Sequence, residues 1–376
     1  MEIKEIGLDL RFMQNPVFRE RGVGRYAKCL LKALWALDDR DWITFKNIGY
    51  SLENSDSIPG KYIQGLSKKG LFQQHIQFPL TLLVKDVKML HYLVHDHASI
   101  YSRQPFIVTV HDLIPVKFPE FNSFHGIKAS LYTKIVGMIL ERAKAIIAIS
   151  ESTKSDIVEC FNIDSEKINV VYHGIEEIYQ PIEKGKATEI LVAKYGIEGP
   201  YLLYLGGFDP RKNVAQLVEM FGKLRKEGLE GKLICVGPPA PYQSFVDVVN
   251  AIAKQRLYRD VFLIGFVSSD DLPLFYSAAD LFLFPSAYEG FGFPILEAMS
   301  CGTPVIAFEN SSIIELLSGS GVLVKNFQEM SRMVLNLLND SKQYNSFRER
   351  GLARAKCFNW ENTAKMTVDV YKKVLL

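Results

Sequence analysis

The stretch at 286–307, SAYEGFGFPILEAMSCGTPVIA, carries two carboxylates, Glu289 and Glu297, around a turn rich in glycine and phenylalanine. A carboxylate can accept two hydroxyl hydrogen bonds at once, so the vicinal hydroxyls of a sugar or a ribose suit it. The backbone N–H groups of Gly290 and Gly292 can meet a phosphate or a sugar oxygen. A favourable charge at a helix N-terminus would explain Glu297 alone. The stretch therefore predicts a site for one ligand with two hydroxyl-rich ends.

Two cations follow an apolar run in 204–213, YLGGFDPRKN. The run predicts a strand that ends at two glycines, and Arg211 and Lys212 then stand where a helical pattern begins. Arginine bridges two oxygens, lysine adds a compact charge, and helix N–H groups also attract anions. The pair predicts a clamp for a diphosphate, and the alternative is two solvated charges in a turn.

His111 lies at the carboxyl end of the predicted strand in 107–115, IVTVHDLIP. A histidine there can donate a hydrogen bond or take a proton near neutral pH. The alternative is a histidine that only pins its own loop.

Gly22 and Gly24, in 20–26, ERGVGRY, lie at the start of a predicted helix. Glycine there lets the backbone approach an anion closely, and the alternative is a plain glycine turn.

A metal site is not expected. The histidines of 91–97, HYLVHDH, have no matching acidic cluster, and His95 and His97 would point to opposite sides of a strand. Asp39 and Asp41 share a D-x-D spacing at the end of a helical pattern, which is typical of solvated charge. No cofactor is expected either.

Short apolar runs alternate with amphipathic stretches along almost the whole chain. Near-continuous apolar runs are typical of strands covered on both faces, and the β-α-β-α order predicts parallel, doubly wound α/β sheets. The predicted strands have the sequences EIGLDL, FIVTVHD, AIIAIS, INVVYHG, YLLYLGG, KLICVG, VFLIGFV, LFLFPS and PVIAF. In such sheets ligands bind beyond the carboxyl ends of the strands, where all four candidate sites fall.

The length of 376 residues favours two domains. A boundary at 172–186, YHGIEEIYQPIEKGK, divides the chain into 1–175 and 176–356. The last stretch, 357–376, predicts a helix that can cross back to the first domain.

The composition favours a soluble globular protein, with 48% apolar and 23% charged residues and a net charge of +2. This balance predicts no nucleic-acid partner. Five scattered cysteines, no signal peptide and no long apolar run predict a cytoplasmic protein. Segment 51–79 mixes lysines with Phe72 and Phe78, so peripheral contact with the inner face of a membrane is one interpretation, and an ordinary exposed loop is the other.

Together these motifs make the chain similar to the retaining nucleotide-sugar glycosyltransferases of family 4, which have two facing Rossmann-like domains, the GT-B fold. The resemblance lies in Glu289-GFGFPIL-Glu297, the E-x7-E pattern, and in GVGRY, TVHDLIP, VYHGI and LGGFDPRKN. GVGRY together with TVHDLIP looks most like the mannosyltransferase branch. Many members have Gly-Arg where this chain has Gly206-Gly207, and Arg211 is expected to replace that arginine.

The resemblance implies a role for each candidate residue. Glu297 would bind the ribose, Glu289 would hold hydroxyls of the transferred sugar, and the backbone from Phe291 to Phe293 would line the sugar and phosphates. Arg211 and Lys212 would hold the diphosphate. The GVGRY loop would close on the phosphates or the acceptor, and His111 would lie near the reactive face of the sugar.

The expected function is transfer of a hexose, with retention and without a metal, from a nucleotide-sugar to a glycan or lipid-linked acceptor. GDP-mannose is slightly favoured over UDP-sugars. Two alternatives are a non-catalytic subunit that binds nucleotide-sugars and a glycoside hydrolase or phosphorylase that uses Glu289 and Glu297 as its acid and base.

Overall fold

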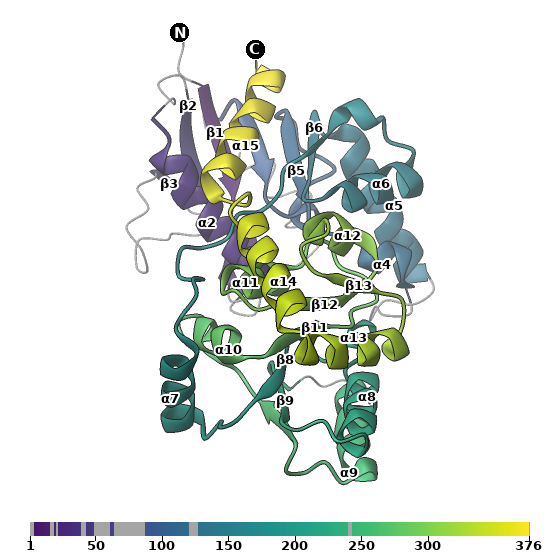
Figure 1. The fold of residues 1–376 in the computed structure, drawn as a ribbon. Helices are drawn as coiled ribbons and strands as arrows, with labels where there is room; N and C mark the ends of the chain where they lie inside the picture. The colour runs from purple at the N-terminus through teal and green to yellow at the C-terminus, as the bar shows by residue number, and fades with distance from the viewer. Residues whose placement is uncertain are drawn as a thin grey trace. The chain divides into compact units, whose positions relative to one another are not determined.

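The computed structural model describes residues 4–15, 19, 22–38, 43–48, 61–63, 87–119, 127–239 and 243–375. The chain divides into two compact units, Met1–Gly174 with Asn359–Leu376, and Ile175–Phe358. These limits lie one and two residues from the boundaries drawn on the sequence. The first unit contains the C-terminal helix, α15 (Figure 1).

The first unit is built on a parallel sheet of seven strands in the order β3-β2-β1-β4-β5-β6-β7. Its strands are β1 Lys4–Asp9, β2 Ile43–Ile48, β3 Lys61–Ile63, β4 Met89–Tyr92, β5 Phe106–Val110, β6 Ala145–Ala148 and β7 Ile168–Val170. Its helices are η1 Arg11–Gln14, α2 Gly22–Ala36, η3 His95–His97, α4 Ile114–Lys117, α5 Ile127–Arg142, α6 Glu151–Phe161, η5 Ser165–Lys167 and α15 Trp360–Leu375.

Neighbouring residues of one strand belong to two different hydrophobic clusters. In β6, Ile147 packs in the cluster that contains α2 and α15, whereas Ile146 packs in the cluster that contains α5 and α6. Side chains alternate across a strand, so the two clusters cover the two faces of the sheet. This double burial explains why these strands read as continuous apolar runs.

The second unit holds a parallel sheet of six strands in the order β10-β9-β8-β11-β12-β13. Its strands are β8 Tyr201–Leu205, β9 Lys232–Val236, β10 Val261–Ile264, β11 Leu281–Phe284, β12 Val305–Phe308 and β13 Val322–Val324. Its helices are α7 Lys184–Tyr195, η6 Pro210–Lys212, α8 Val214–Lys226, α9 Gln243–Gln255, α10 Leu272–Ala278, α11 Phe293–Ser300, α12 Ser311–Leu317, α13 Phe327–Asn339 and α14 Ser341–Ala355. The predicted α/β class, two doubly wound parallel sheets, is confirmed.

Local reading of the sequence missed four strands. β2, with the sequence ITFKNI, and β4, with MLHY, contain polar residues, and β3 and β13 have only three residues each. His95–His97 form a 3-10 turn, so the argument that these two histidines point to opposite sides of a strand does not apply.

A buried chain of polar side chains ties α15 to the first sheet. The hydroxyl of Tyr371 lies 2.7 Å from Nδ1 of His91, and Nε2 of His91 lies 2.8 Å from Oγ1 of Thr109. The hydroxyl of Tyr26, on α2, meets the same Oγ1 at 3.1 Å. Burial lowers the pKa of His91 to about 3, and His111 adds to this, so His91 is neutral at pH 7.

The start of α15 also packs directly against the chain at Gly174. A Cβ added to Gly174 would lie 2.3 Å from the backbone nitrogen of Trp360, closer than packed atoms can come. One turn later, Thr363 Oγ1 donates a hydrogen bond of 2.8 Å to the carbonyl of Tyr172. The packing of α15 therefore fixes the chain just after β7.

We predict that Tyr371→Phe lowers the free energy of unfolding by about 1–3 kcal/mol, because it leaves one ring nitrogen of His91 without its partner in a buried site. Urea denaturation of the two proteins measures the difference. Tyr101→Phe is the matched control, since Tyr101 is 59% exposed and should lose almost nothing. Equal stabilities for Tyr371→Phe and the parent would show that this hydrogen bond adds no stability.

Candidate functional site

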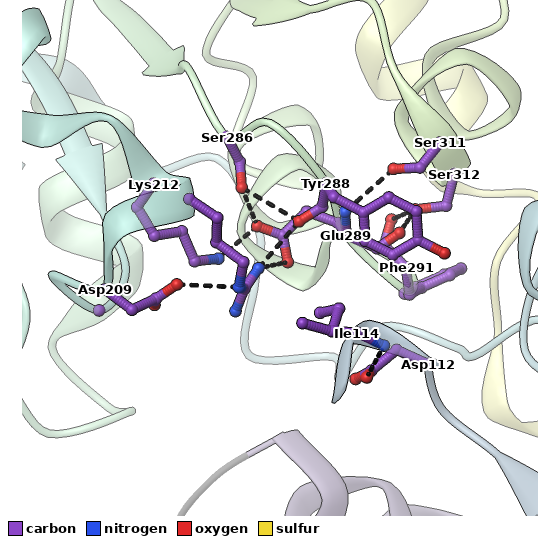
Figure 2. A network of polar contacts seen from close by, with 12 residues as sticks. Asp112, Ile114, Asp209, Lys212, Ser286, Tyr288, Glu289, Phe291, Ser311 and Ser312 are labelled. Atoms are coloured by element: carbon purple, nitrogen blue, oxygen red, sulfur yellow. Dashed lines mark hydrogen bonds and ion pairs between the residues drawn. The ribbon is translucent and has the colours of Figure 1, made fainter. Parts of the chain in front are cut away.

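The carboxylate of Glu289 lies at the centre of a compact polar cluster in the second unit (Figure 2). One of its oxygens pairs with the ammonium of Lys212 and accepts the hydroxyl of Ser286. The other oxygen lies 3.2 Å from Nη1 of Arg211, whose Nε lies 2.8 Å from Asp209. The predicted diphosphate clamp and the predicted sugar carboxylate therefore form one cluster.

The cluster is buried and highly charged. Burial alone would raise the pKa of Glu289, but Lys212 and Arg211 outweigh this and lower the pKa to about 2. Lys212 is 8% exposed, and burial lowers its pKa while Glu289 opposes the fall. An ion pair out of water is stable only when every charge has partners, and here each has at least one. Glu289 is thus a carboxylate at any physiological pH.

The order of the strands brings these residues together. β8 and β11 are neighbours in the sheet, so the turns after them, which carry Lys212 and Glu289, start side by side. Two further hydrogen bonds join the two turns. The Ala287 N–H donates to the carbonyl of Arg211 at 2.7 Å, and the Arg211 side chain donates through Nη1 to the carbonyl of Tyr288 at 2.8 Å. Arg211 and Lys212 lie on η6, one residue before α8, and not on the helix itself.

Glu297 lies apart from this cluster, in the middle of α11. It is 2% exposed, and its Oε2 accepts a hydrogen bond of 2.6 Å from the hydroxyl of Tyr276, on α10. The spacing therefore does not put the two acids on one helical face. Tyr276 is a functional candidate that sequence reasoning missed, because nothing in LPLFYSA marks its hydroxyl as a carboxylate partner.

The glycine-rich turn joins the two acids. Gly292 has a φ of 111° at the N-cap of α11, a conformation that favours glycine. Phe291 is 5% exposed and stacks edge-on against Phe293, with 5.4 Å between the ring centroids. The predicted lining residues, Gly290 to Phe293, thus lie between the Glu289 cluster and the helix of Glu297.

His111 lies in the first unit, directly after β5. Its Nε2 lies 2.9 Å from the carbonyl of Leu93, which can only accept, so Nε2 carries the hydrogen and Nδ1 remains the acceptor. Burial lowers the pKa of His111 to about 4, although the Leu93 carbonyl opposes the fall. Of the two predicted uses of His111, proton uptake near neutral pH is therefore wrong, because His111 is neutral there. The other use, hydrogen-bond donation, is seen in the contact of Nε2 with the Leu93 carbonyl.

Two aromatic groups that sequence reasoning missed surround His111. The ring of Tyr26 lies 4.8 Å from the ring of His111 and 4.6 Å from that of His173, which follows β7. Burial lowers the pKa of His173 well below its usual value, with smaller contributions from His111 and Arg25. Gly22 and Gly24 form the first turn of α2, the helix that carries Tyr26. The GVGRY motif therefore reaches His111 through its tyrosine.

The described residues were also predicted to lack a metal site and a membrane-spanning segment. Among the described residues, no group of three or more His, Cys, Asp or Glu side chains could hold a metal ion. In the same part of the chain, no helix combines the length and apolarity that a membrane crossing needs. Asp39, Asp41 and the loop residues of 51–79 lie outside the described residues, apart from the β3 backbone.

Comparison with known proteins gives matches for both units. Residues 21–177 match the family described as Glycosyltransferase Family 4, and residues 188–354 match Glycosyl transferases group 1. The chain therefore carries the two domains of a glycosyltransferase. It is 28% identical over 372 residues to an O-antigen chain mannosyltransferase B of Escherichia coli, covering 93% of this chain and 96% of that relative.

This glycosyltransferase has further relatives. It is 25% identical to the O-antigen chain mannosyltransferase RfbU of Salmonella typhimurium, over 87% of this chain and 90% of the relative. The structure of HepE from Anabaena in complex with UDP and glucose matches 98% of this chain and all of that chain, with a TM-score of 0.77 at 17% identity. At this identity the match shows the fold alone, the GT-B fold of glycosyltransferases.

The depressed pKa of His111 predicts a pH-dependent stability. Its folded pKa of about 4 lies below the ordinary 6.5, so the unfolded chain takes up the proton first. Stability should be full above pH 6.5 and fall towards pH 4, by up to about 1.4 kcal/mol per pH unit for each such histidine. Urea denaturation between pH 7.5 and 4.5 measures this fall. The free energy of unfolding that His111→Gln loses relative to the parent should shrink as the pH falls. A loss that stays constant with pH would contradict a lowered pKa of His111.

Proposed function

We propose that this glycosyltransferase moves a hexosyl group from a nucleotide diphosphate sugar to a hydroxyl of a glycan or lipid-linked saccharide, with retention at the anomeric carbon. The observation that carries the proposal is the Glu289 cluster, which joins a hydroxyl-binding carboxylate to two cations that suit a diphosphate. Mannose is our first choice of sugar and GDP of nucleotide, because full-length relatives are named mannosyltransferases. UDP-sugars are the second choice.

Glu289, Arg211 and Lys212 each have a use in this reaction. The bond from the anomeric carbon to the diphosphate breaks, a bond to the acceptor oxygen forms on the same face, and the acceptor proton passes to the leaving phosphate. Arg211 and Lys212 would stabilise the negative charge that develops on that phosphate. The phosphates would compete with Glu289 for the two cations, which would turn the carboxylate towards the sugar hydroxyls.

The remaining candidates complete the proposed site. Glu297, beside Tyr276, would hold the ribose, and the backbone of Gly290 to Phe293 would line the sugar and phosphates. His111, neutral at pH 7, would offer Nδ1 as an acceptor near the sugar. The start of α2, with Gly22 and Gly24, would close on the phosphates or the acceptor.

The two alternative functions have less support. A glycoside hydrolase needs one carboxyl group that stays protonated as the general acid, with a raised pKa. The pKa of Glu289 is lowered to about 2, so Glu289 cannot be that acid. A hydrolase also has no need of the two cations, Lys212 and Arg211, that hold Glu289 and suit a diphosphate. A subunit that only binds nucleotide-sugars would not need a buried carboxylate between the two cations.

We predict that Glu289→Ala lowers kcat by about 100-fold or more, because its contacts strengthen as the sugar becomes cationic in the transition state. Initial rates of sugar transfer from the donor measure this. Glu227→Ala, an exposed glutamate in the same unit, is the control and should keep the parent rate. An unchanged rate in Glu289→Ala would refute the assigned role, and a folded parent that binds donor without turnover would favour the non-catalytic subunit.

The donor is tested by thermal shift with UDP, GDP, ADP and TDP and their common sugars, with and without EDTA. A nucleotide at 100 times its dissociation constant should add about 2.7 kcal/mol of stability. We expect GDP to respond most strongly and both binding and turnover to survive EDTA, since the two cations replace a divalent ion. Loss of turnover that Mg²⁺ restores would contradict the metal-free mechanism, and no response to any nucleotide would contradict the proposed site.

A further inference from the structure

Three consecutive side chains at the start of α12, Asn310 to Ser312, hold the turn that carries Glu289. Figure 2 shows Ser311 and Ser312 beside Glu289. The Glu289 N–H donates to Ser311 Oγ at 2.9 Å, and Ser312 Oγ lies 2.9 Å from the carbonyls of both Glu289 and Phe291. Asn310 Nδ2 donates to the carbonyl of Ser286 at 2.5 Å. Both backbone polar groups of Glu289 thus have a partner in this segment.

These side chains do not serve their own helix. Asn310 is the N-cap residue of α12, where Asn and Ser normally accept hydrogen bonds from the first N–H groups, yet it makes no side-chain cap. The Ser311 hydroxyl donates to Asn310 Oδ1 at 2.9 Å, which leaves its oxygen oriented to accept from Glu289. The hydrogen-bonding capacity of the helix start is therefore directed at the turn of Glu289.

Ser311 adopts a backbone conformation that is unfavourable for serine. Its φ is 34°, in the left-handed region that favours glycine. Such strain persists where the surrounding structure requires it and is concentrated at functional sites. A glycine would adopt this conformation more readily but would lack the hydroxyl that meets Glu289. The hydroxyl thus supplies a reason for serine at this position.

We propose that Ser311 is a positioning residue for Glu289. By holding the Glu289 N–H, it fixes the backbone of the turn. The carboxylate is then held between Lys212 and Arg211 until the phosphates arrive, and from there it turns to the donor sugar. Ser286, on the other side, contacts the carboxylate itself. The inference rests on the proposed function, because it takes Glu289 as the residue that contacts the sugar.

Two variants at Ser311 and one control test this proposal. Ser311→Gly relieves the strain and deletes the hydroxyl, and Ser311→Ala keeps the strain and deletes the hydroxyl. We expect both to lower kcat about tenfold, the effect of one lost hydrogen bond, with the donor KM within about twofold of the parent. The melting temperature should be higher for Ser311→Gly than for Ser311→Ala.

The control is Ser318→Gly, at the other end of the same helix. Ser318 has a φ of 42°, is exposed, and is the C-cap residue of α12. Relief of strain there should leave kcat unchanged and keep or raise the melting temperature. A purely structural role for Ser311 predicts the same result for Ser311→Gly.

The proposal is overturned if folded Ser311→Gly or Ser311→Ala keeps the parent kcat. Glu289→Ala in the same assay separates this failure from that of the proposed function. If Glu289→Ala is slow and the Ser311 variants are not, only the positioning role is wrong. If Glu289→Ala turns over like the parent, the proposed role of Glu289 fails instead.

Discussion

The second unit depends on a buried carboxylate that must be paired. Glu289 lies out of water, and an unpaired charge there would be costly, so the chain has to bring Lys212 and Arg211 to it. This requirement links the turn after β8 to the turn after β11 through backbone as well as side chains. It also explains the surrounding hydroxyls, because each contacts the carboxylate or the backbone of the Glu289 turn. An ionic cluster held from so many sides is preorganised to stabilise charge on a ligand.

The first unit collects its polar groups in the same place, the carboxyl edge of a parallel sheet, but with opposite electrostatics. His111 and His173 are buried and neutral, and both contact the aromatic ring of Tyr26. A neutral site suits hydroxyl groups, and the charged site of the second unit suits a diphosphate. The helix α15, fixed by His91, packs against the helix that carries Tyr26, so the last residues of the chain support this site.

Much of the molecule could be predicted from the sequence alone. The apolar runs predicted parallel sheets because strands covered on both faces, such as β6, need apolar residues at every position. The glycines and the charged residues predicted turns after strands, and those turns carry Glu289, Lys212 and His111. Local chemistry was enough for these features because each depends on a few neighbouring residues. Strands with polar residues, such as β2, were missed for the same reason.

The sequence by itself determined which residues are available for the chemistry and that they follow strands. Only the tertiary structure decided which of them meet. Lys212 and Glu289 are far apart in the chain and pair because β8 and β11 are neighbours, and no local pattern encodes strand order. The neutrality of His111 and the strain at Ser311 likewise arise from burial and from contacts with distant segments. Proximity and desolvation are properties of the packed chain, so they appear only once the sheets are assembled.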